Sequence, residues 1–185
     1  NEAVGLSAQL GKRVGELGIP VYLYEYSAAN LTRKNLAYLR KGEYEAIEEK
    51  MKLPEWRPDF GKQIFNERFG MIAIGARDFL IAYNINLTTK DEHIAKKIAK
   101  QIRTIREKND GSFESNLVQH VKAIGWFMQD FDCAQVSMNI TNIEKSPIID
   151  VFSLVKKMAQ QFGENTNGSE LIGLIPLKAF HTKND

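Results

Sequence analysis

Two segments of the sequence alternate apolar side chains with uncharged polar ones, so their polar members are candidates for binding a polar ligand. Because side chains alternate across a β-strand, residues 79–87 and 133–141 would each present one apolar face and one polar face. Such rows are typical of a solvated sheet face. Their lack of charge, and the presence of asparagine, a poor strand former, favour a partly enclosed polar cavity instead. The side chains expected to line it are Asn84, Asn86, Gln135, Ser137 and Asn139.

Arg77 stands just before the first of these segments and is a further candidate for lining the cavity. A guanidinium at this position could bind a ligand carboxylate through two hydrogen bonds. A surface ion pair is an equally plausible role for Arg77. Upstream, residues 54–69 contain two prolines and four aromatic residues without a clear period. Irregular loops of this length are uncommon, and ordered ones often carry function.

Side chains suited to acid, base, nucleophilic or metal chemistry are scattered along the chain. His93, His120 and His181 fall in three separate elements without metal-ligand spacing, so we predict no metal site and interpret each as a surface histidine. His120 could face the cavity if its strand has the right register. Cys133 lacks the surroundings of a nucleophile, and Gly75 is followed by alanine and arginine, which excludes a phosphate-binding loop.

The second half of the sequence predicts a complete domain. It alternates period-2 segments with amphipathic helical ones that begin at Thr89, in a capping box with Glu92, and at Pro147. The order of strand, helix, strand, strand, helix, strand is that of a ferredoxin-like α/β sandwich, an α+β fold. The predicted segments are strand 79–87, helix 89–107, strands 118–128 and 133–141, helix 147–162 and strand 169–175.

The first half begins with a predicted helix that no strand precedes, so it is interpreted as the end of a domain whose start is missing. A short strand and two polar helices follow. The predicted elements are helix 2–17, strand 21–24 and helices 32–40 and 43–51. We therefore expect two domains, 1–78 and 79–185.

Composition narrows the class of protein. The 25 basic and 23 acidic residues leave a net charge of +2, so a nucleic-acid partner is not expected. The single cysteine excludes an internal disulfide and fits a reducing, cytoplasmic location. Neither a membrane span nor a secretion signal is expected, because the longest apolar stretch, 79–83, is far shorter than the ~20 residues that a span needs.

Six blocks of the sequence, in family order and spanning nearly the whole chain, closely resemble the glutamate formiminotransferase (formimidoyltransferase) family. They are residues 18–24 (GIPVYLY), 40–45 (RKGEYE), 54–61 (PEWRPDFG), 75–87 (GARDFLIAYNINL), 134–139 (AQVSMN) and 168–177 (GSELIGLIPL). The resemblance implies two ferredoxin-like subdomains facing each other across a substrate tunnel, here with the first incomplete and the second complete as βαββαβ. It also implies transfer of the formimino group from N-formimino-L-glutamate to N5 of tetrahydrofolate in histidine degradation, with no metal, and weakly suggests a homodimer.

The resemblance further assigns folate binding to the loop 61–70. Its aromatic residues would pack on the pteridine or benzoyl ring, and Lys62 and Arg68 would lie near the glutamate tail. The alternative interpretation is a loop that only packs over the core. The assigned residues are Gly61, Lys62, Gln63, Ile64, Phe65, Asn66, Glu67, Arg68, Phe69 and Gly70.

Family members use a catalytic histidine early in the N-terminal subdomain, a position that would precede Asn1. No histidine of this chain matches it, so we expect no catalytic residue here and no activity from these residues alone. The chain is also expected to stop before the family's closing helix, and residues 25–28 depart from the family pattern.

Two alternatives remain open at this stage. One is a related folate enzyme that transfers a formyl group to or from glutamate. The other is a non-catalytic ferredoxin-like module that binds a small molecule or RNA, although neither paired strand shows the basic and aromatic row of an RNA platform.

Overall fold

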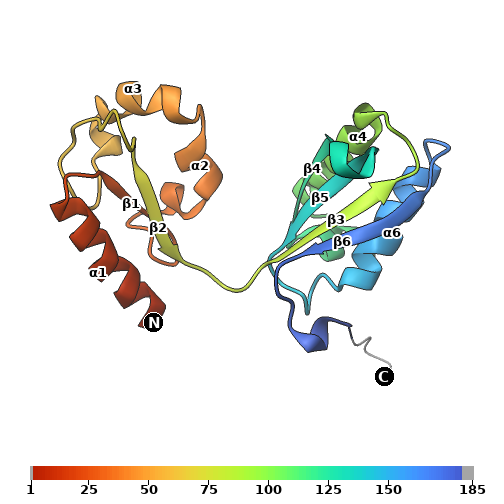
Figure 1. Ribbon diagram of the computed structural model, residues 1–185. Coiled ribbons are helices and arrows are strands. Elements are labelled where there is room, and N and C mark those ends of the chain that lie inside the picture. The colour runs from red at the N-terminus through yellow and green to blue at the C-terminus, as the bar shows by residue number, and fades with distance from the viewer. Residues whose placement is uncertain (1, 181–185) are drawn as a thin grey trace. The chain divides into compact units, whose positions relative to one another are not determined.

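The computed structural model describes residues 2–180, except for the side chains of Lys178 and Phe180, and divides into two units. The units comprise Asn1–Arg77 and Asp78–Asp185, and each is described by itself (Figure 1). No helix within the described range is both long and apolar enough to pass through a membrane.

A pair of parallel strands forms the centre of the first unit. Strand β1 (Val21–Glu25) lies beside β2 (Ile72–Ala76) in register, from Val21 opposite Ile72 to Glu25 opposite Ala76. Strand β2 was not predicted from the sequence. The helices of this unit are α1 (Glu2–Glu16), α2 (Leu36–Arg40) and α3 (Ile47–Met51), with 3-10 turns at Leu31–Lys34, Tyr44–Ala46 and Pro54–Trp56.

The helix predicted at 32–40 is divided in two, whereas the helix predicted at 43–51 is present with a first turn of 3-10 type. Asn35 has the extended angles φ −92° and ψ 112°, and its side chain accepts a hydrogen bond from Ala37 N, so it ends one helical turn and caps α2. Glu43, at φ 47°, precedes the 3-10 turn Tyr44–Ala46, which runs directly into α3 at Ile47. Asparagine favours such capping positions because its side chain competes with the backbone for hydrogen bonds.

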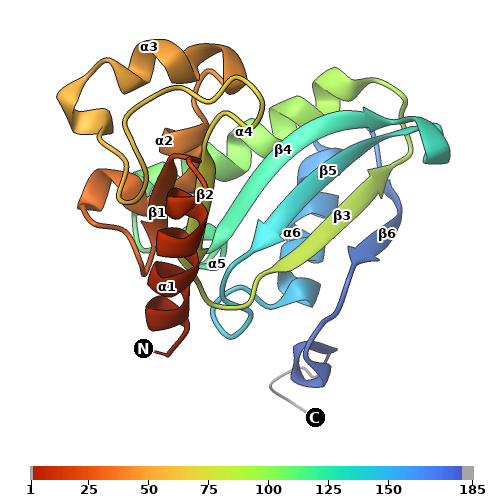
Figure 2. The same cartoon turned by 60° about the vertical axis from the view of Figure 1, so that its left-hand side comes forward.

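The second unit is a four-stranded antiparallel sheet with helices packed against one face, which confirms the predicted α+β fold and its βαββαβ order. Figure 2 shows α4 and α6 behind the sheet. The strands lie in the order β4-β5-β3-β6. The elements are β3 (Ile81–Leu87), α4 (Glu92–Lys108), α5 (Phe113–Val118), β4 (Val121–Met128), β5 (Cys133–Ile140), α6 (Ile148–Gln160) and β6 (Thr166–Ile172).

The core of this unit lies between the sheet and its helices. Alternate residues of β3 and β5 enter it, including Ile85 and Val136, and are fully buried together with Ile98 of α4 and Val155 of α6. Helix α4 crosses β4 so closely that a Cβ on Gly125 would lie 2.2 Å from the backbone of Ala95. The apolar faces of the two strands therefore point at the helices, as predicted, and their polar faces point the other way.

Several predicted boundaries of the second unit were wrong. Phe79 lies outside β3 and is 90% exposed, so it is not a core residue. Residues 113–118 form α5, capped by the Ser112 side chain, so the next strand begins at 121 and not at 118. Asp91, and not Thr89, caps α4 by accepting from His93 N at 2.9 Å. Strand β6 begins and ends three residues before the predicted strand, and Gly173, at φ 80°, follows its last residue.

Candidate functional site

The polar rows of β3 and β5 meet side by side on the face of the sheet that α4 and α6 leave uncovered. In the strand register Asn84 lies opposite Ser137, and Asn86 lies opposite Gln135. Asn139 follows one pair further along, opposite Ala82. The five side chains predicted from these two strands therefore share one surface.

Hydrogen bonds join three of these amides, Asn84, Asn86 and Gln135, into a network centred on Gln135, whose side chain is fully buried. Trp126 Nε1 donates to Gln135 Oε1 at 2.7 Å, and Gln135 Nε2 donates to Asn86 Oδ1 at 2.8 Å. Glu170 of β6 also joins the network. Asn84 Nδ2 of β3 donates to Glu170 Oε2 at 3.1 Å, and Gln135 Nε2 lies 3.4 Å from the same oxygen. Each amide is thus held in one orientation, which is the property of a preorganised binding surface.

The charged residues of this face were not predicted from the sequence. Glu170 of β6 lies opposite Asn84, and Lys122 of β4 lies opposite Asn139. The alternation of side chains along β4 and β6 would have placed both residues on this face, but only once the register of these outer strands was known. The face is therefore a neutral amide centre with one carboxylate and one ammonium group on its outer strands.

Arg77 belongs to the other unit of the chain. It directly follows β2, in the first unit, and its side chain is exposed. It is therefore not part of the sheet that carries the other five predicted side chains.

The predicted folate loop, residues 61–70, has a backbone fixed by hydrogen bonds. Asn66 Oδ1 accepts from Arg68 N at 3.1 Å and from Phe69 N at 3.0 Å, which closes a tight turn. Tyr44 donates to the carbonyl oxygen of Glu67 at 2.5 Å, and Gln63 donates to the carbonyl oxygen of Met51 at 2.6 Å. The loop is therefore ordered by side chains from both inside and outside it.

The ends of the loop are glycines whose geometry excludes a side chain. Gly61 has φ 85°, and a Cβ there would lie 2.8 Å from Ile19 O. Gly70 has φ 63° and is buried against Tyr44 and Ile47. Both glycines are required for the path of the backbone and leave ligand contacts to the residues between them.

Between those glycines the side chains are mostly exposed. Ile64 is 65% exposed and Phe69 54%, and the Arg68 guanidinium lies 5.3 Å from the centroid of the Phe69 ring. Lys62 is exposed as well, whereas Phe65 is half-buried with its ring 5.5 Å from that of Tyr44. An ordered backbone therefore presents apolar and cationic groups to solvent.

Phe69 also lines a cavity of about 410 Å³ within the first unit. The walls are largely apolar and aromatic, with Arg40 and Glu43 as the charged members, a composition common in sites for flat organic ligands. The lining residues are Tyr24, Leu36, Leu39, Arg40, Glu43, Tyr44, Ile47, Phe69, Met71 and Ala73.

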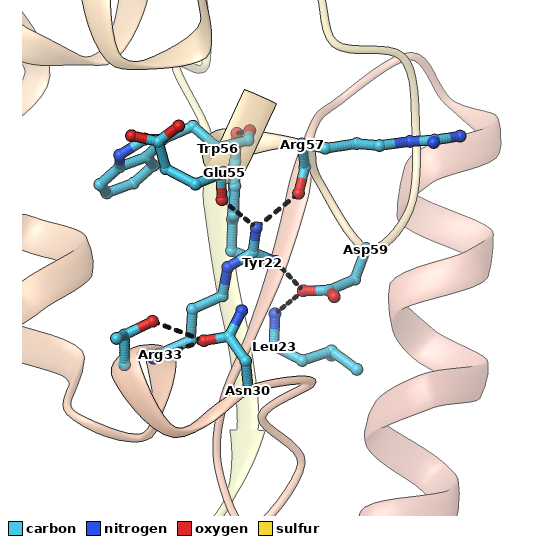
Figure 3. A network of polar contacts seen from close by, with 9 residues as sticks. Tyr22, Leu23, Asn30, Arg33, Glu55, Trp56, Arg57 and Asp59 are labelled. Atoms are coloured by element: carbon cyan, nitrogen blue, oxygen red, sulfur yellow. Dashed lines mark hydrogen bonds and ion pairs between the residues drawn. The ribbon is translucent and has the colours of Figure 1, made fainter. Parts of the chain in front are cut away.

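A buried ion pair anchors the segment that leads into the loop. Figure 3 shows Arg33 donating to Asp59 Oδ2 at 3.0 Å and to the carbonyl oxygens of Glu55 and Arg57 at 2.8 and 2.6 Å. The same Asp59 oxygen accepts from Leu23 N of β1 at 2.7 Å. Residues 55–59 are therefore bound both to the central strand and to the 3-10 turn that carries Arg33.

Within the described residues, the surroundings of Cys133, His93 and His120 do not favour a catalytic role. Burial raises the pKa of the Cys133 thiol, which disfavours the nucleophilic thiolate. Burial, and then the charge of Lys145, lower the pKa of His120, which precedes β4. His93 is exposed on the first turn of α4, and His181 lies outside the described residues. Within residues 2–180 no three His, Cys, Asp or Glu side chains gather as metal ligands would.

Comparison with known proteins follows the same division of the chain. Residues 1–77 match the model of the formiminotransferase domain, N-terminal subdomain, and residues 82–185 match that of the formiminotransferase domain. The chain is 43% identical over 179 residues to the glutamate formimidoyltransferase of Streptococcus pyogenes and 44% identical over 179 residues to that of Thermoplasma acidophilum. It is 42% identical over 180 residues to the formimidoyltransferase-cyclodeaminase of Dictyostelium discoideum.

These alignments include 95–96% of the chain but only part of each relative. The chain spans 57% and 56% of the two glutamate formimidoyltransferases and 33% of the formimidoyltransferase-cyclodeaminase.

Proposed function

The chain belongs to the formiminotransferase family, and from that premise we propose that the full-length protein transfers the formimino group of N-formimino-L-glutamate to N5 of tetrahydrofolate, a step of histidine degradation. Relatives that are 43–44% identical are named glutamate formimidoyltransferases. In this reaction N5 forms a bond to the formimino carbon and loses its proton, the bond from that carbon to the glutamate nitrogen breaks, and the departing amine takes up a proton. We assign no proton transfer to His93 or His120.

We propose that the loop 61–70 binds tetrahydrofolate. The observation that carries this proposal is the combination of a fixed backbone, exposed Lys62 and Arg68, and Phe69 in the wall of an aromatic cavity. Aromatic rings favour stacking on the pteridine or benzoyl ring, and cations pair with the carboxylates of the glutamate tail. A loop that is ordered before binding loses little conformational entropy when folate binds.

For the second substrate, the proposed binding surface is the amide face of the second unit. Asn86 is partly exposed, and a hydrogen bond from the fully buried Gln135 orients its amide, so its Nδ2 can donate to a polar ligand without rearranging. Asn86→Ala is expected to raise the KM for formiminoglutamate. An unchanged KM and an unchanged rate would contradict this assignment.

The folate proposal is tested by calorimetric titration of 5-formyltetrahydrofolate, a stable folate, into the full-length protein and its Asn66→Ala variant. Loss of the Asn66 side chain opens the turn that positions Arg68 and Phe69, so the expected result is a Kd raised by about tenfold, which corresponds to ~1.4 kcal/mol. Asn116→Ala, an exposed change on α5, is the matched control and should bind like the wild type. Equal affinity in all three proteins would show that loop 61–70 does not position folate.

A further inference from the structure

Glu170 is the one carboxylate that the structure brings into the hydrogen-bond network of the amide face, within the part of the chain it describes. It lies opposite Asn84 in the register of β3 and β6. The Asn84 amide donates to Glu170 Oε2 at 3.1 Å, and the Gln135 amide lies 3.4 Å from the same oxygen. Hydrogen bonds with Trp126 and Asn86 fix the orientation of the Gln135 amide, and this amide in turn helps to orient the Glu170 carboxylate.

The two amide donors lie on one oxygen of the carboxylate and leave the other oxygen for a ligand. Both reach Oε2, and among residues 2–180 no hydrogen bond reaches Oε1 and no lysine or arginine forms an ion pair with Glu170. A carboxylate has about four acceptor positions. Glu170 therefore presents an oriented negative charge beside neutral amides, on the outer strand opposite the one that carries Lys122.

This charge fits one feature of the proposed donor substrate. A formimino group is an amidine, which is protonated at neutral pH and carries N–H groups on both of its nitrogens. Two such donors match a carboxylate as the guanidinium of arginine does, with charge-assisted hydrogen bonds. A formyl amide has the same heavy-atom outline, but it is neutral and has a carbonyl oxygen where the amidine has an N–H donor.

We propose that Glu170 binds the formimino end of the donor substrate and makes the site prefer a formimino group over a formyl group. This inference rests on the proposed function and names the residue that sets its specificity. Asn84 and Gln135 then act as positioning residues that hold the carboxylate toward the amidinium. A formyl donor would place its carbonyl oxygen against the carboxylate, which costs binding energy because two acceptors face each other.

The test compares wild type with Glu170→Gln, which removes the charge and keeps the shape, in the full-length protein. Two quantities are measured: the KM for formiminoglutamate and the KI of formylglutamate as a competitive inhibitor. The expected result is a KM raised at least tenfold, with a KI that is unchanged or lowered. Glu164→Gln is the matched control, because Glu164 is a carboxylate near the start of β6 that accepts from Thr88 and not from the amide network.

Two further variants guard against a result that reflects folding alone. Glu170→Asp keeps the charge and should retain part of the preference for formiminoglutamate. Asn84→Leu removes one donor that orients Glu170, and it should raise the KM for formiminoglutamate more than the KI of formylglutamate. Circular dichroism and the Kd for 5-formyltetrahydrofolate should match those of wild type in each variant.

The possible failures can be told apart. If wild type transfers the formimino group but Glu170→Gln changes KM and KI by the same factor, or changes neither, the assignment of Glu170 is wrong while the proposed function stands. If wild type transfers nothing from formiminoglutamate, the proposed function itself is wrong.

Discussion

Arg33 and Asp59 form an ion pair at 3.0 Å, with only 6% and 12% of their side chains exposed. The pair joins the turn after β1 to the segment that enters the loop 61–70, and Arg33 also binds the carbonyl oxygens of Glu55 and Arg57. The geometry of the proposed folate loop thus depends on a charge pair inside the first unit.

Arg33→Leu is therefore expected to lower the free energy of unfolding by about 3–5 kcal/mol, because Asp59 would remain buried without its partner. Chemical denaturation monitored by circular dichroism measures this change. Arg40→Leu breaks an exposed pair with Glu43 and should cost less than ~1 kcal/mol. Similar losses for the two variants would show that the Arg33 pair is not a structural anchor.

The Gln135 network gives a second stability prediction. Gln135→Met keeps a similar volume but leaves Trp126 Nε1 and Asn86 Oδ1 without this partner, so it should cost about 1–3 kcal/mol. Asn139→Met, on the exposed part of the same strand, should change stability by less than ~0.5 kcal/mol. A Gln135→Met protein as stable as wild type would mean that the network contributes nothing to folding.

Lys62 and Arg68 are predicted to contribute to folate affinity through charge. Lys62→Gln and Arg68→Gln should each raise the Kd for 5-formyltetrahydrofolate by about threefold to tenfold, with a smaller effect at high salt, since both side chains are exposed. The matched ligand, 5-formyltetrahydropteroate, lacks the glutamate tail and should bind wild type and variants alike. If the variants also bind 5-formyltetrahydropteroate more weakly than wild type does, Lys62 and Arg68 do not act through the glutamate tail.

The stability of the second unit should depend on the ionisation of His120. Its pKa lies below the usual 6.5 because of burial and the charge of Lys145, so the folded protein takes up this proton less readily than the unfolded chain. The corresponding stability is present above about pH 6.5 and is lost as the pH falls below it. His120→Gln should therefore reduce the fall in Tm between pH 7.5 and 5.5, and Lys145→Gln should reduce it in part. An unchanged fall in both variants would contradict this.

The second unit could be predicted from the sequence because its signals are periodic. The alternation from Ile81 to Leu87 and from Cys133 to Ile140 gives both the strands and the face on which Asn84 and Gln135 lie, and the structure confirms these placements. The first unit was harder, because β2 contains a glycine and two alanines, and its pairing with β1 spans some fifty residues.

What the sequence could not give was the register between strands. Glu170 and Lys122 read as ordinary charged residues until the pairing of β6 and β4 places them beside Asn84 and Asn139. In the same way, the exposed position of Phe79 and the capping of α4 by Asp91 follow from where the chain turns, which local periodicity does not fix.

Formimino transfer to folate is tested most directly by following a labelled formimino carbon. The full-length protein is incubated with tetrahydrofolate and N-formimino-L-glutamate carrying carbon-13 in the formimino group, and the products are measured by mass spectrometry. The expected result is label in the folate product and release of an equal amount of unlabelled glutamate, only when enzyme and tetrahydrofolate are both present. Label that stays on glutamate, or leaves it without tetrahydrofolate, would contradict the proposed function.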